Sequence, residues 1–346
     1  MLQSEVVKPF KLGDLSICIP YFNGLKYLDE LFSSLIVNEL VQCQLCISID
    51  SNREGEISEI NNLLQKYNFA HSIVVQNKEN MGYSKNLEIV TRLSNREWIL
   101  LMGQDDLILP GSIAKYESML RDNPNISIIS RNYYWFENDV KTPIRILTSR
   151  LRKNIIVNRN SSAKDIILLL ETVGQLSGLL IRRDKIINKL SSNVFTAHVE
   201  PILIALQDSN IGILSDNTVA VRTSSSQTRF RNDIYIESPT KQWSLSYEFI
   251  KEYMNAKTYD LILRKHMGSN FKGLLQVRIM CGLAGLINEI SEMRKLNRWI
   301  FFDIRFMAYL FICLVLPSKA LRLVIDFTKN NVFRLFLSNK YKGNDE

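Results

Sequence analysis

The sequence is poor in the residues that hold transition metals and in those that form disulfide frameworks. Its 346 residues include only three histidines, which are scattered, and five cysteines. Cys43-Gln-Leu-Cys46 has the spacing of half a zinc site, but no second pair of ligands follows it. A metal–thiolate site is therefore disfavoured. The odd, unpatterned set of cysteines fits a reducing compartment better than an oxidising one.

Long uncharged apolar runs are also missing. No stretch reaches the roughly 18 residues expected of a membrane-spanning helix, and the uncharged segment Phe306–Leu316 is far shorter. The first 13 residues are mixed polar, and the apolar run that follows, Leu15–Ile19, is too short for the core of a signal peptide. We find no internal repeat and no low-complexity segment. The sequence therefore predicts a protein that is made in the cytoplasm and stays there.

Positive charge is concentrated at one end of the chain. Residues 1–240 contain 26 Lys and Arg against 26 Asp and Glu, whereas residues 241–346 contain 17 against 9, which accounts for the net charge of +8. The basic region also has the apolar stripes of long helices, including Leu274–Met293, and a last apolar patch at 332–336. Such helices are typical of a surface that binds an anionic bilayer.

Packing within the protein is an alternative role for the basic region. Its helices could pack on the main domain or form the interface of a homo-oligomer. Binding to nucleic acid is disfavoured, because no recognised nucleic-acid motif accompanies the basic residues. We therefore expect residues 241–346 to form a helical extension that lies on the inner face of the cell membrane.

Strand-like runs and helical periodicities alternate over the first 125 residues. Short apolar runs are separated by segments with apolar residues at i, i+3 and i+4, the spacing of amphipathic helices. This alternation predicts an α/β domain with a mostly parallel sheet and helices on both faces. Strands are expected at Leu15–Pro20, Leu45–Asp50, Ser72–Gln76 and Trp98–Pro110, and helices at Leu25–Leu40, Ile57–Tyr67, Lys85–Leu93 and Ser112–Arg121.

Polar residues follow each of these four strands. They are Asn23, Asp50, Asn80–Asn86 and the adjacent pair Asp105 and Asp106. Because loops after parallel strands share one edge of a sheet, these groups are expected to face a common crevice. Adjacent carboxylates repel each other unless a cation or hydrogen bonds compensate them. The pair therefore predicts a divalent-metal site for a phosphate-bearing ligand, with a solvated turn as the alternative.

The pattern is less regular after residue 126. We expect residues 126–240 to form the second half of the same domain, with strands at Ile126–Ser130, Gln175–Ile181, 211–214 and 218–221. A helix is expected at Ala163–Leu170, and another at 197–206 with His198 and Glu200 near its start. An acid at that place can simply favour the helix dipole, so the pattern alone does not make either residue catalytic.

Four motifs in this order resemble a family 2 glycosyltransferase with a GT-A fold. Ser16–Asn23 resembles the first strand and the nucleotide-contacting turn of that family, and Asp50-Ser51 stands where it usually has Asp-Asp-Gly-Ser. Asn80–Asn86 resembles its Asn-x-Gly-x-x-x-Asn segment, and Gln104-Asp105-Asp106 resembles its acidic motif. The resemblance is clear over residues 15–111 and looser to about residue 221. It implies a nucleotide-binding half at about 15–125 and an acceptor half at about 126–240.

The resemblance implies roles for the residues that match. Asp50 would hydrogen-bond the nucleotide base, and Asp105, supported by Asp106, would ligate Mg²⁺ or Mn²⁺ that bridges the donor diphosphate. Such an ion would offset charge on the leaving group. Gly103 stands where the family usually has a further Asp. The remaining residues of the expected nucleotide-sugar site are Pro20, Tyr21, Asn23, Gly82, Asn86 and Gln104.

An inverting transfer also needs a general base beside the acceptor hydroxyl. In the family this base is an acid near a helix start, after the strand that Gln175–Ile181 resembles. Glu200 is the candidate by that resemblance, and His198 is the second because its ordinary pKa suits the task.

The sequence is thus interpreted as a metal-dependent hexosyltransferase-like enzyme. It would move a sugar from a nucleoside-diphosphate sugar to a saccharide, which the basic extension suggests is lipid-linked, in assembly of a bacterial surface polysaccharide such as O-antigen or capsule. A non-catalytic sugar-nucleotide-binding or scaffold protein on the same fold and a nucleotidyltransferase remain alternatives. No nucleic-acid partner is expected, and a homo-oligomer is possible.

Overall fold

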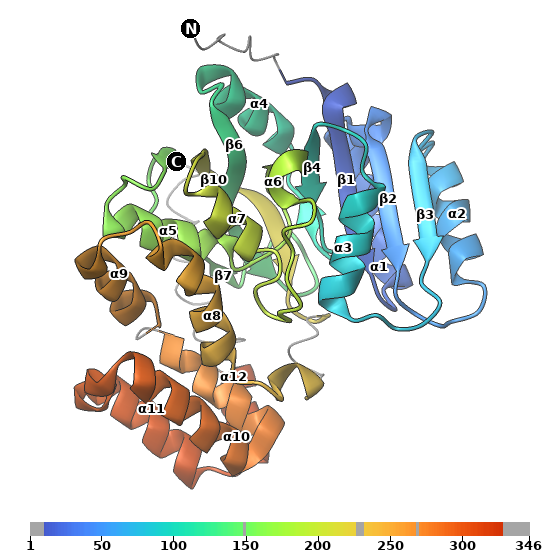
Figure 1. The fold of residues 1–346 in the computed structure, drawn as a ribbon. Coiled ribbons are helices and arrows are strands. Elements are labelled where there is room, and N and C mark those ends of the chain that lie inside the picture. Colours follow the sequence, from blue (N-terminus) through green and yellow to red (C-terminus); the bar gives the residue numbers. More distant parts are fainter. Residues whose placement is uncertain (1–9, 148–149, 226–231, 268–269, 328–346) are drawn as a thin grey trace, which may run out of the picture.

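The computed structural model describes residues 10–147, 150–225, 232–267 and 270–327. Within them the chain forms one ten-stranded mixed sheet, in the order β3-β2-β1-β4-β9-β6-β10-β5, with β7 on β6 and β8 on β10 (Figure 1). The strands are β1 Leu15–Tyr21, β2 Gln44–Ile49, β3 Ser72–Gln76, β4 Trp98–Leu101, β5 Leu107–Ile108, β6 Ile126–Phe136, β7 Arg145–Ile146, β8 Ile155–Val157, β9 Leu179–Arg182 and β10 Asn210–Arg222.

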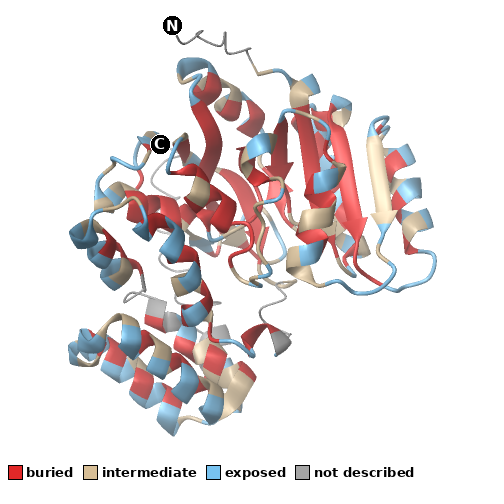
Figure 2. Cartoon of the chain, viewed as in Figure 1, coloured by how far each residue is buried: buried red, intermediate tan, exposed pale blue. Residues whose placement is uncertain are grey.

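The helices cover both faces of this sheet. Its strands send alternate side chains to opposite faces, so Ile17 and Ile19 enter one apolar core and Cys18 the other. The helices are α1 Leu25–Val37, α2 Glu56–Lys66, α3 Tyr83–Leu93, α4 Ser112–Asp122, α5 Ala163–Val173, α6 Arg183–Ile186, α7 Glu200–Ala205, α8 Pro239–Lys251, α9 Ala256–Ile262, α10 Leu274–Leu296, α11 Ile304–Val315 and α12 Ser318–Phe327. Helices α1, α2 and α4 pack on the first core, and α3, α5, α7, α8 and α9 pack on the second (Figure 2).

Most predicted elements lie where the periodicity put them, but several strands differ. Strand β6 extends to Phe136, β9 begins only at Leu179, and β7 and β8 were not predicted. The run Trp98–Pro110 is two strands rather than one, because the chain turns at residues 103–106 and β5 then pairs antiparallel with β10. The two short strands expected at 211–214 and 218–221 are one strand, β10, whose register shifts between Leu214 and Asn217. The strands β1–β4 run parallel, so the loops after β1, β2 and β4 emerge at one edge.

The predicted division at residue 240 does not coincide with a change of core. Tyr247 of α8 and Tyr259 of α9 are buried in the second core of the main sheet. A separate small core begins at Phe271 and is built by α10, α11 and the short helix η7 (Arg298–Phe302). We call residues 271–327 the helical extension below. The last apolar patch expected at 332–336 lies outside the described residues.

A buried carboxylate ties the extension to the main domain. Glu289 of α10 accepts hydrogen bonds from the Thr240 backbone N–H at 3.1 Å and the Thr240 hydroxyl at 2.5 Å, and also from the Ser238 hydroxyl. Ser238 is the N-cap of α8, so the charge lies at a helix N-terminus, where it is favoured.

Helix α10 is, by length and composition, the one described helix that could cross a membrane, and 28% of its apolar window is buried. In the fold it is the central helix of the extension. It contacts α8, α11 and α12, and its Arg278 donates to the Cys313 carbonyl at 3.1 Å.

Candidate active site

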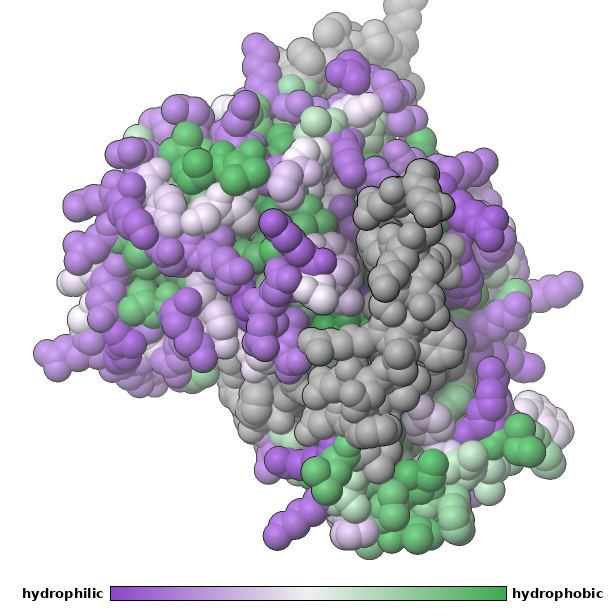
Figure 3. Space-filling view, turned by 180° about the vertical axis from the view of Figure 1, so that it is seen from behind, coloured by the Kyte–Doolittle hydropathy of each residue, from purple (hydrophilic) through white to green (hydrophobic). Residues whose placement is uncertain are grey.

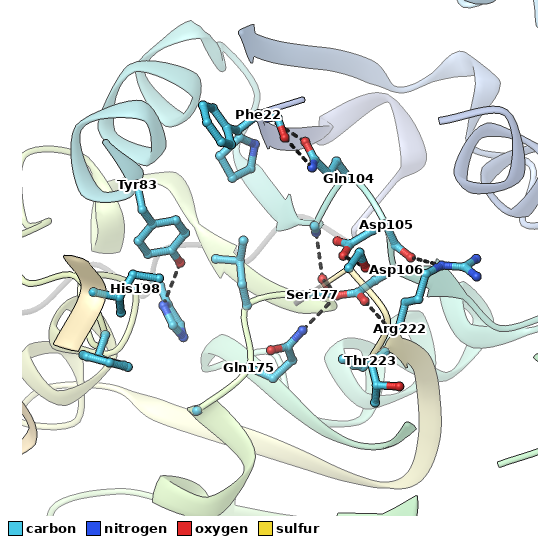
Figure 4. A pocket seen from close by; sticks show the side chains of 18 of the residues that line it. Phe22, Tyr83, Gln104, Asp105, Asp106, Gln175, Ser177, His198, Arg222 and Thr223 are labelled. Atoms are coloured by element: carbon cyan, nitrogen blue, oxygen red, sulfur yellow. Dashed lines mark hydrogen bonds between the residues drawn. The ribbon is translucent and has the colours of Figure 1, made fainter. Parts of the chain in front are cut away.

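A cavity of about 690 Å³ opens at the edge of the sheet where β1, β2 and β4 end (Figure 4). Its walls come from segments that lie far apart in the sequence. The described residues that line it are Pro20, Phe22, Asp50, Gly82, Tyr83, Asn86, Gly103, Gln104, Asp105, Asp106, Trp135, Ile144, Arg145, Gly174, Gln175, Leu176, Ser177, Val194, Phe195, His198, Val221, Arg222, Thr223, Ser225, Ile234 and Gln276. Most of the residues predicted for donor binding, metal binding or catalysis are among them.

Asp50 fixes the loop that follows β3. One carboxylate oxygen accepts hydrogen bonds from the Met81 N–H at 2.7 Å and the Asn77 amide at 2.8 Å, and the other accepts from the Gly82 N–H at 2.9 Å. Gly82 has a φ of 80°, a backbone conformation that L side chains rarely adopt. Asn86, one helical turn on, donates to the Tyr21 carbonyl at 3.2 Å. Asp50, Gly82 and Asn86 therefore form one wall of the cavity.

Gln104 joins the acidic loop to the turn after β1. Its amide oxygen accepts from the Phe22 N–H at 2.6 Å, and its amide nitrogen donates to the Phe22 carbonyl at 2.8 Å. The side chain thus pairs with the main chain of Phe22 through both its donor and its acceptor. Gly24 leaves the room for this contact, since a Cβ there would lie 2.3 Å from the Gln104 amide. The motif pattern did not single out Gly24 or Phe22 for this role.

Asp105 and Asp106 have different surroundings although they are adjacent. Asp106 is 2% exposed, and both its oxygens are occupied. One accepts from the Arg222 N–H at 2.8 Å, and the other accepts from the Gln175 amide at 2.8 Å and the Ser177 hydroxyl at 2.5 Å. Asp105 is half-buried and accepts a hydrogen bond from the Ser225 hydroxyl through Oδ2. Its Oδ1 receives no hydrogen bond from another described residue.

Burial disfavours the state in which both carboxyl groups of this pair are ionised. It raises the pKa of Asp105, and it raises the pKa of Asp106 to about 7, with the neighbouring Asp105 charge as the second cause. The donors around Asp106 act in the opposite direction. A cation beside Asp105 would relieve the repulsion.

The donor set fits a hard cation that is shared with a ligand. Mg²⁺ commonly binds through one or two carboxylates and completes its shell with water and substrate phosphates. Asp105 can supply one such oxygen, whereas the oxygens of Asp106 are committed to the protein. Within the described residues no group of three His, Cys, Asp or Glu side chains gathers as a metal site. In this structure the Asp106 carboxylate supports the loop, and its expected role as a metal ligand stays a prediction.

Gly103 lies close to the side chains of Ser177 and of both carboxylates. A Cβ at this position would lie 3.0 Å from both the Asp106 carboxylate and the Ser177 hydroxyl, and 3.3 Å from the Asp105 carboxylate. Ser177 also accepts a hydrogen bond from the Gly103 N–H at 2.7 Å. A side chain at position 103 would therefore require the Ser177 hydroxyl and the two carboxylates to shift by a few tenths of an ångström.

Several residues that the sequence did not single out hold the acidic loop. Arg222 at the end of β10 donates to the Asp105 carbonyl at 3.1 Å and forms an ion pair with Glu30. Arg131 is fully buried on β6 and donates to the carbonyls of Thr172 and Gln175, both at 2.9 Å. Arg131 thereby fixes the segment that carries the Asp106 partners Gln175 and Ser177. These contacts join segments that are distant in the sequence, so no local sequence pattern predicts them.

His198 lines the cavity opposite the acidic loop and bridges the two halves of the domain. Its Nε2 lies 3.0 Å from the Val173 carbonyl, which can only accept, so Nε2 carries the proton and Nδ1 accepts from the Tyr83 hydroxyl at 3.0 Å. Burial lowers the pKa of His198 to about 4. The imidazole is therefore neutral, with its basic nitrogen turned toward Tyr83 at the start of α3 (Figure 4).

Three predicted site residues lie off the cavity wall. Glu200 is 4% exposed and accepts from the Ser246 hydroxyl of α8 at 3.0 Å. Tyr21 is fully buried, with its hydroxyl on the carboxylate of Glu56. Asn23 follows at the exposed turn with a φ of 51°. Any contribution of Tyr21 and Asn23 to the cavity is through the backbone of the turn after β1.

Sequence comparison assigns the family. Residues 16–188 match the model of glycosyl transferase family 2. The chain belongs to this family. An abequosyltransferase, RfbV, of Salmonella typhimurium is 29% identical over 119 residues, and an uncharacterised glycosyltransferase of Haemophilus influenzae is 28% identical over 115 residues. These matches cover 34% and 33% of this chain and about a third of each relative, 35% and 37%.

Solved structures confirm the fold prediction. Residues 1–349 of TarS from S. aureus, in complex with UDP-GlcNAc, align with a TM-score of 0.61 and 15% identity, over 83% of this chain and 82% of TarS 1–349. The mannosyltransferase PcManGT from Pyrobaculum calidifontis, in complex with GDP-Man and Mn²⁺, aligns with a TM-score of 0.53 and 10% identity, over 96% of this chain and 85% of PcManGT. At such identities the similarity shows the fold alone. This family 2 chain thus has the predicted GT-A architecture.

Proposed function

We propose that this family 2 protein transfers a sugar from a nucleoside-diphosphate sugar to a saccharide acceptor. The observation that supports it most is that one cavity joins the Asp50–Gly82–Asn86 wall to Asp105 and then to the wall of the second half of the domain. The base and ribose would lie at the Asp50 end and the diphosphate at Asp105, which leaves the far end for the acceptor. The RfbV relative, named an abequosyltransferase, is in keeping with a role in O-antigen-like polysaccharide.

A divalent cation is part of this proposal. Asp105 would hold Mg²⁺ or Mn²⁺ against the donor diphosphate, and the ion would stabilise the negative charge that develops on the leaving group. The chain itself would orient the donor. Asp50 keeps the Asn80–Asn86 loop in place, and Gln104 fixes the turn at Phe22.

The acceptor hydroxyl needs a base on the far side of the sugar if the transfer inverts the anomeric carbon. His198 and Glu200 are both 4% exposed, but only His198 lines the cavity. Its unprotonated Nδ1 accepts from the Tyr83 hydroxyl, which would have to move away before Nδ1 could take the acceptor proton. We therefore propose His198 as the base, with Glu200 as the alternative that the resemblance suggests. Measuring kcat of two variants distinguishes these candidate bases. His198→Gln should lower kcat about 10²-fold or more, while Glu200→Gln should change mainly the stability of the fold.

The extension is proposed to bind a membrane, which would present a lipid-linked acceptor to the cavity. Exposed apolar residues recur at i, i+3 and i+7 along α11, beginning with Ile304, Met307 and Phe311, on the side opposite its buried stripe. Phe302 of η7, 79% exposed, extends this face. Figure 3 shows hydrophobic residues gathered over the described part of the extension. Exposed Arg294, Arg298, Lys319 and Arg322 accompany them, as an anionic bilayer requires.

The donor proposal is tested by thermal shift with a panel of nucleoside diphosphates and their sugars, with and without Mn²⁺. A ligand that binds only the native state must raise the melting temperature. We expect one nucleotide to raise it, more with Mn²⁺ than without. If no member of the panel shifts it, the proposal fails. A shift without any transfer or hydrolysis would instead support a non-catalytic scaffold. Release of inorganic diphosphate from a nucleoside triphosphate and a sugar phosphate would support a nucleotidyltransferase.

A further inference from the structure

A cationic side chain lies on the wall of the cavity beyond the acidic loop. Arg145 of β7 is opposite Trp135 of β6 in the antiparallel register, and both line the cavity. The sheet order places β6 and β7 on the far side of β4 and β9 from the Asp50 wall. Arg145 is therefore at the end of the cavity that the proposed function leaves for the acceptor.

The guanidinium of Arg145 is held but not neutralised. It stacks on the Trp135 ring with its central carbon 3.6 Å from the ring centroid, and Trp135 is in turn braced by Tyr133, 4.8 Å away between centroids. No described residue forms a salt bridge or hydrogen bond with this guanidinium. A stacked guanidinium keeps its N–H donors in its own plane and free at the edge, which suits a bidentate contact with an oxyanion.

A second arginine on the cavity wall, Arg222, has its guanidinium bound by acceptors of the protein itself. The guanidinium of Arg222 donates to the carbonyls of Asp105 and Glu137 and pairs with the carboxylate of Glu30. Arg145 has the same kind of aromatic support but none of these acceptors. Arg222 is 7% exposed, whereas Arg145 is exposed, so the N–H donors of Arg145 are open to solvent and to a ligand that enters the cavity.

We propose that Arg145 binds an anionic group of the acceptor, a phosphate or a carboxylate. This inference rests on the proposed function, because it assumes that the donor occupies the Asp50–Asp105 part of the cavity. The cavity wall also has apolar residues, among them Ile144, Val194 and Phe195. The anionic group could belong to a lipid phosphate or to an acidic sugar, and the experiment separates these sources.

The test measures binding at the acceptor end while the donor end is filled. The full chain is saturated with Mn²⁺ and the nucleoside diphosphate found by thermal shift, and then titrated with farnesyl diphosphate, farnesol or methyl glucuronide. The variant Arg145→Met is compared with wild type and with Arg182→Met, an arginine that pairs with Asp184 away from the cavity. Arg145→Lys keeps the charge but loses the bidentate edge.

We expect one anionic probe to bind wild type and Arg182→Met equally, and Arg145→Met about tenfold or more weakly, with Arg145→Lys in between. Binding of farnesyl diphosphate but not farnesol identifies a lipid phosphate, and binding of methyl glucuronide identifies an acidic sugar. Equal affinity of wild type and Arg145→Met for every probe, or no probe binding at all, overturns the proposal. So does weaker nucleotide binding in Arg145→Met, since Arg145 would then serve the donor. If wild type binds no nucleotide, the proposed function has failed instead.

Discussion

At the scale of single residues, the site depends on two adjacent carboxylates that differ in burial and in the hydrogen bonds they accept. Asp106 is buried among three donors from two distant segments. Asp105 lines the cavity, and the hydrogen bond that it accepts from the Ser225 hydroxyl uses only one of its oxygens. The sequence predicted an acidic pair at a strand end, and that placement is what the structure has. The sequence could not show which of the two acids is hydrogen-bonded by the protein, because Gln175, Ser177 and Arg222 lie 69 to 116 residues away from Asp106.

This difference predicts that the two acids respond differently to mutation. Asp106→Ala leaves the Gln175 amide, the Ser177 hydroxyl and the Arg222 N–H without their acceptor, so it should lower the free energy of unfolding by about 2–4 kcal/mol. Asp105→Asn should cost less than about 1 kcal/mol because Asp105 is less committed. Urea denaturation of both variants measures this. Equal losses of stability would contradict the different roles.

Two buried histidines predict a dependence of stability on pH. Burial lowers the pKa of His198 and of His266 to about 4, whereas an unfolded histidine titrates near 6.5. Between these values the unfolded chain binds more protons, so each histidine destabilises the fold as pH falls from about 6.5 toward 4, and its effect is absent above that window.

The variant His266→Gln isolates this effect away from the cavity. Its free energy of unfolding, measured by urea denaturation from about pH 7.5 to about pH 4.5, should fall less steeply with decreasing pH than that of wild type. The exposed His71 provides the matched control, and His71→Gln should follow wild type. Parallel curves for wild type and His266→Gln would rule out a buried, neutral His266.

At the scale of elements, the central parallel strands β1 and β2 were predictable because such strands are continuous apolar runs bounded by turns. The edge strand β3 was predictable from a short apolar run of the same kind. The break between β4 and β5 was not, since Gly103–Asp106 changes the direction of the chain through hydrogen bonds rather than through hydropathy. The single long β10 resembles two strands in the sequence for a related reason. Its bulge at Ser215–Asn217 is polar, and polar residues between apolar runs look like a turn.

The join between α8 and α10 predicts an effect of one buried carboxylate. Glu289→Gln keeps one oxygen for Thr240 but removes the charge at the α8 N-terminus and one acceptor. The free energy that opens the extension should fall by about 1–3 kcal/mol. Hydrogen exchange of α10 and α11 amides measures it. Glu292→Gln, on the same helix but paired with Lys295 at the surface, is the control and should leave the exchange rates unchanged.

At the scale of the whole molecule, the exposed face of the extension predicts binding to anionic vesicles. Phe302 and Phe311 are 79% and 66% exposed, so Phe302→Ser/Phe311→Ser should keep the fold while removing the apolar contact. Flotation with phosphatidylcholine vesicles that contain phosphatidylglycerol should recover wild type, and recover the variant several-fold less. The matched control Val37→Ser/Ile236→Ser removes residues that are 61% and 79% exposed elsewhere, and should float like wild type. Equal flotation of both variants would refute this face as the membrane contact.

The central claim concerns the cavity as a donor site for sugar transfer. The most direct measurement is hydrolysis of the nucleoside-diphosphate sugar selected by thermal shift, in which the sugar passes to water. Release of nucleoside diphosphate is followed for wild type and for Asp105→Asn with Mn²⁺. We predict that wild type releases the nucleotide and that Asp105→Asn does so about 10²-fold or more slowly, with a nearly unchanged unfolding midpoint. Turnover that is equal in the two proteins would contradict a reaction organised around Asp105.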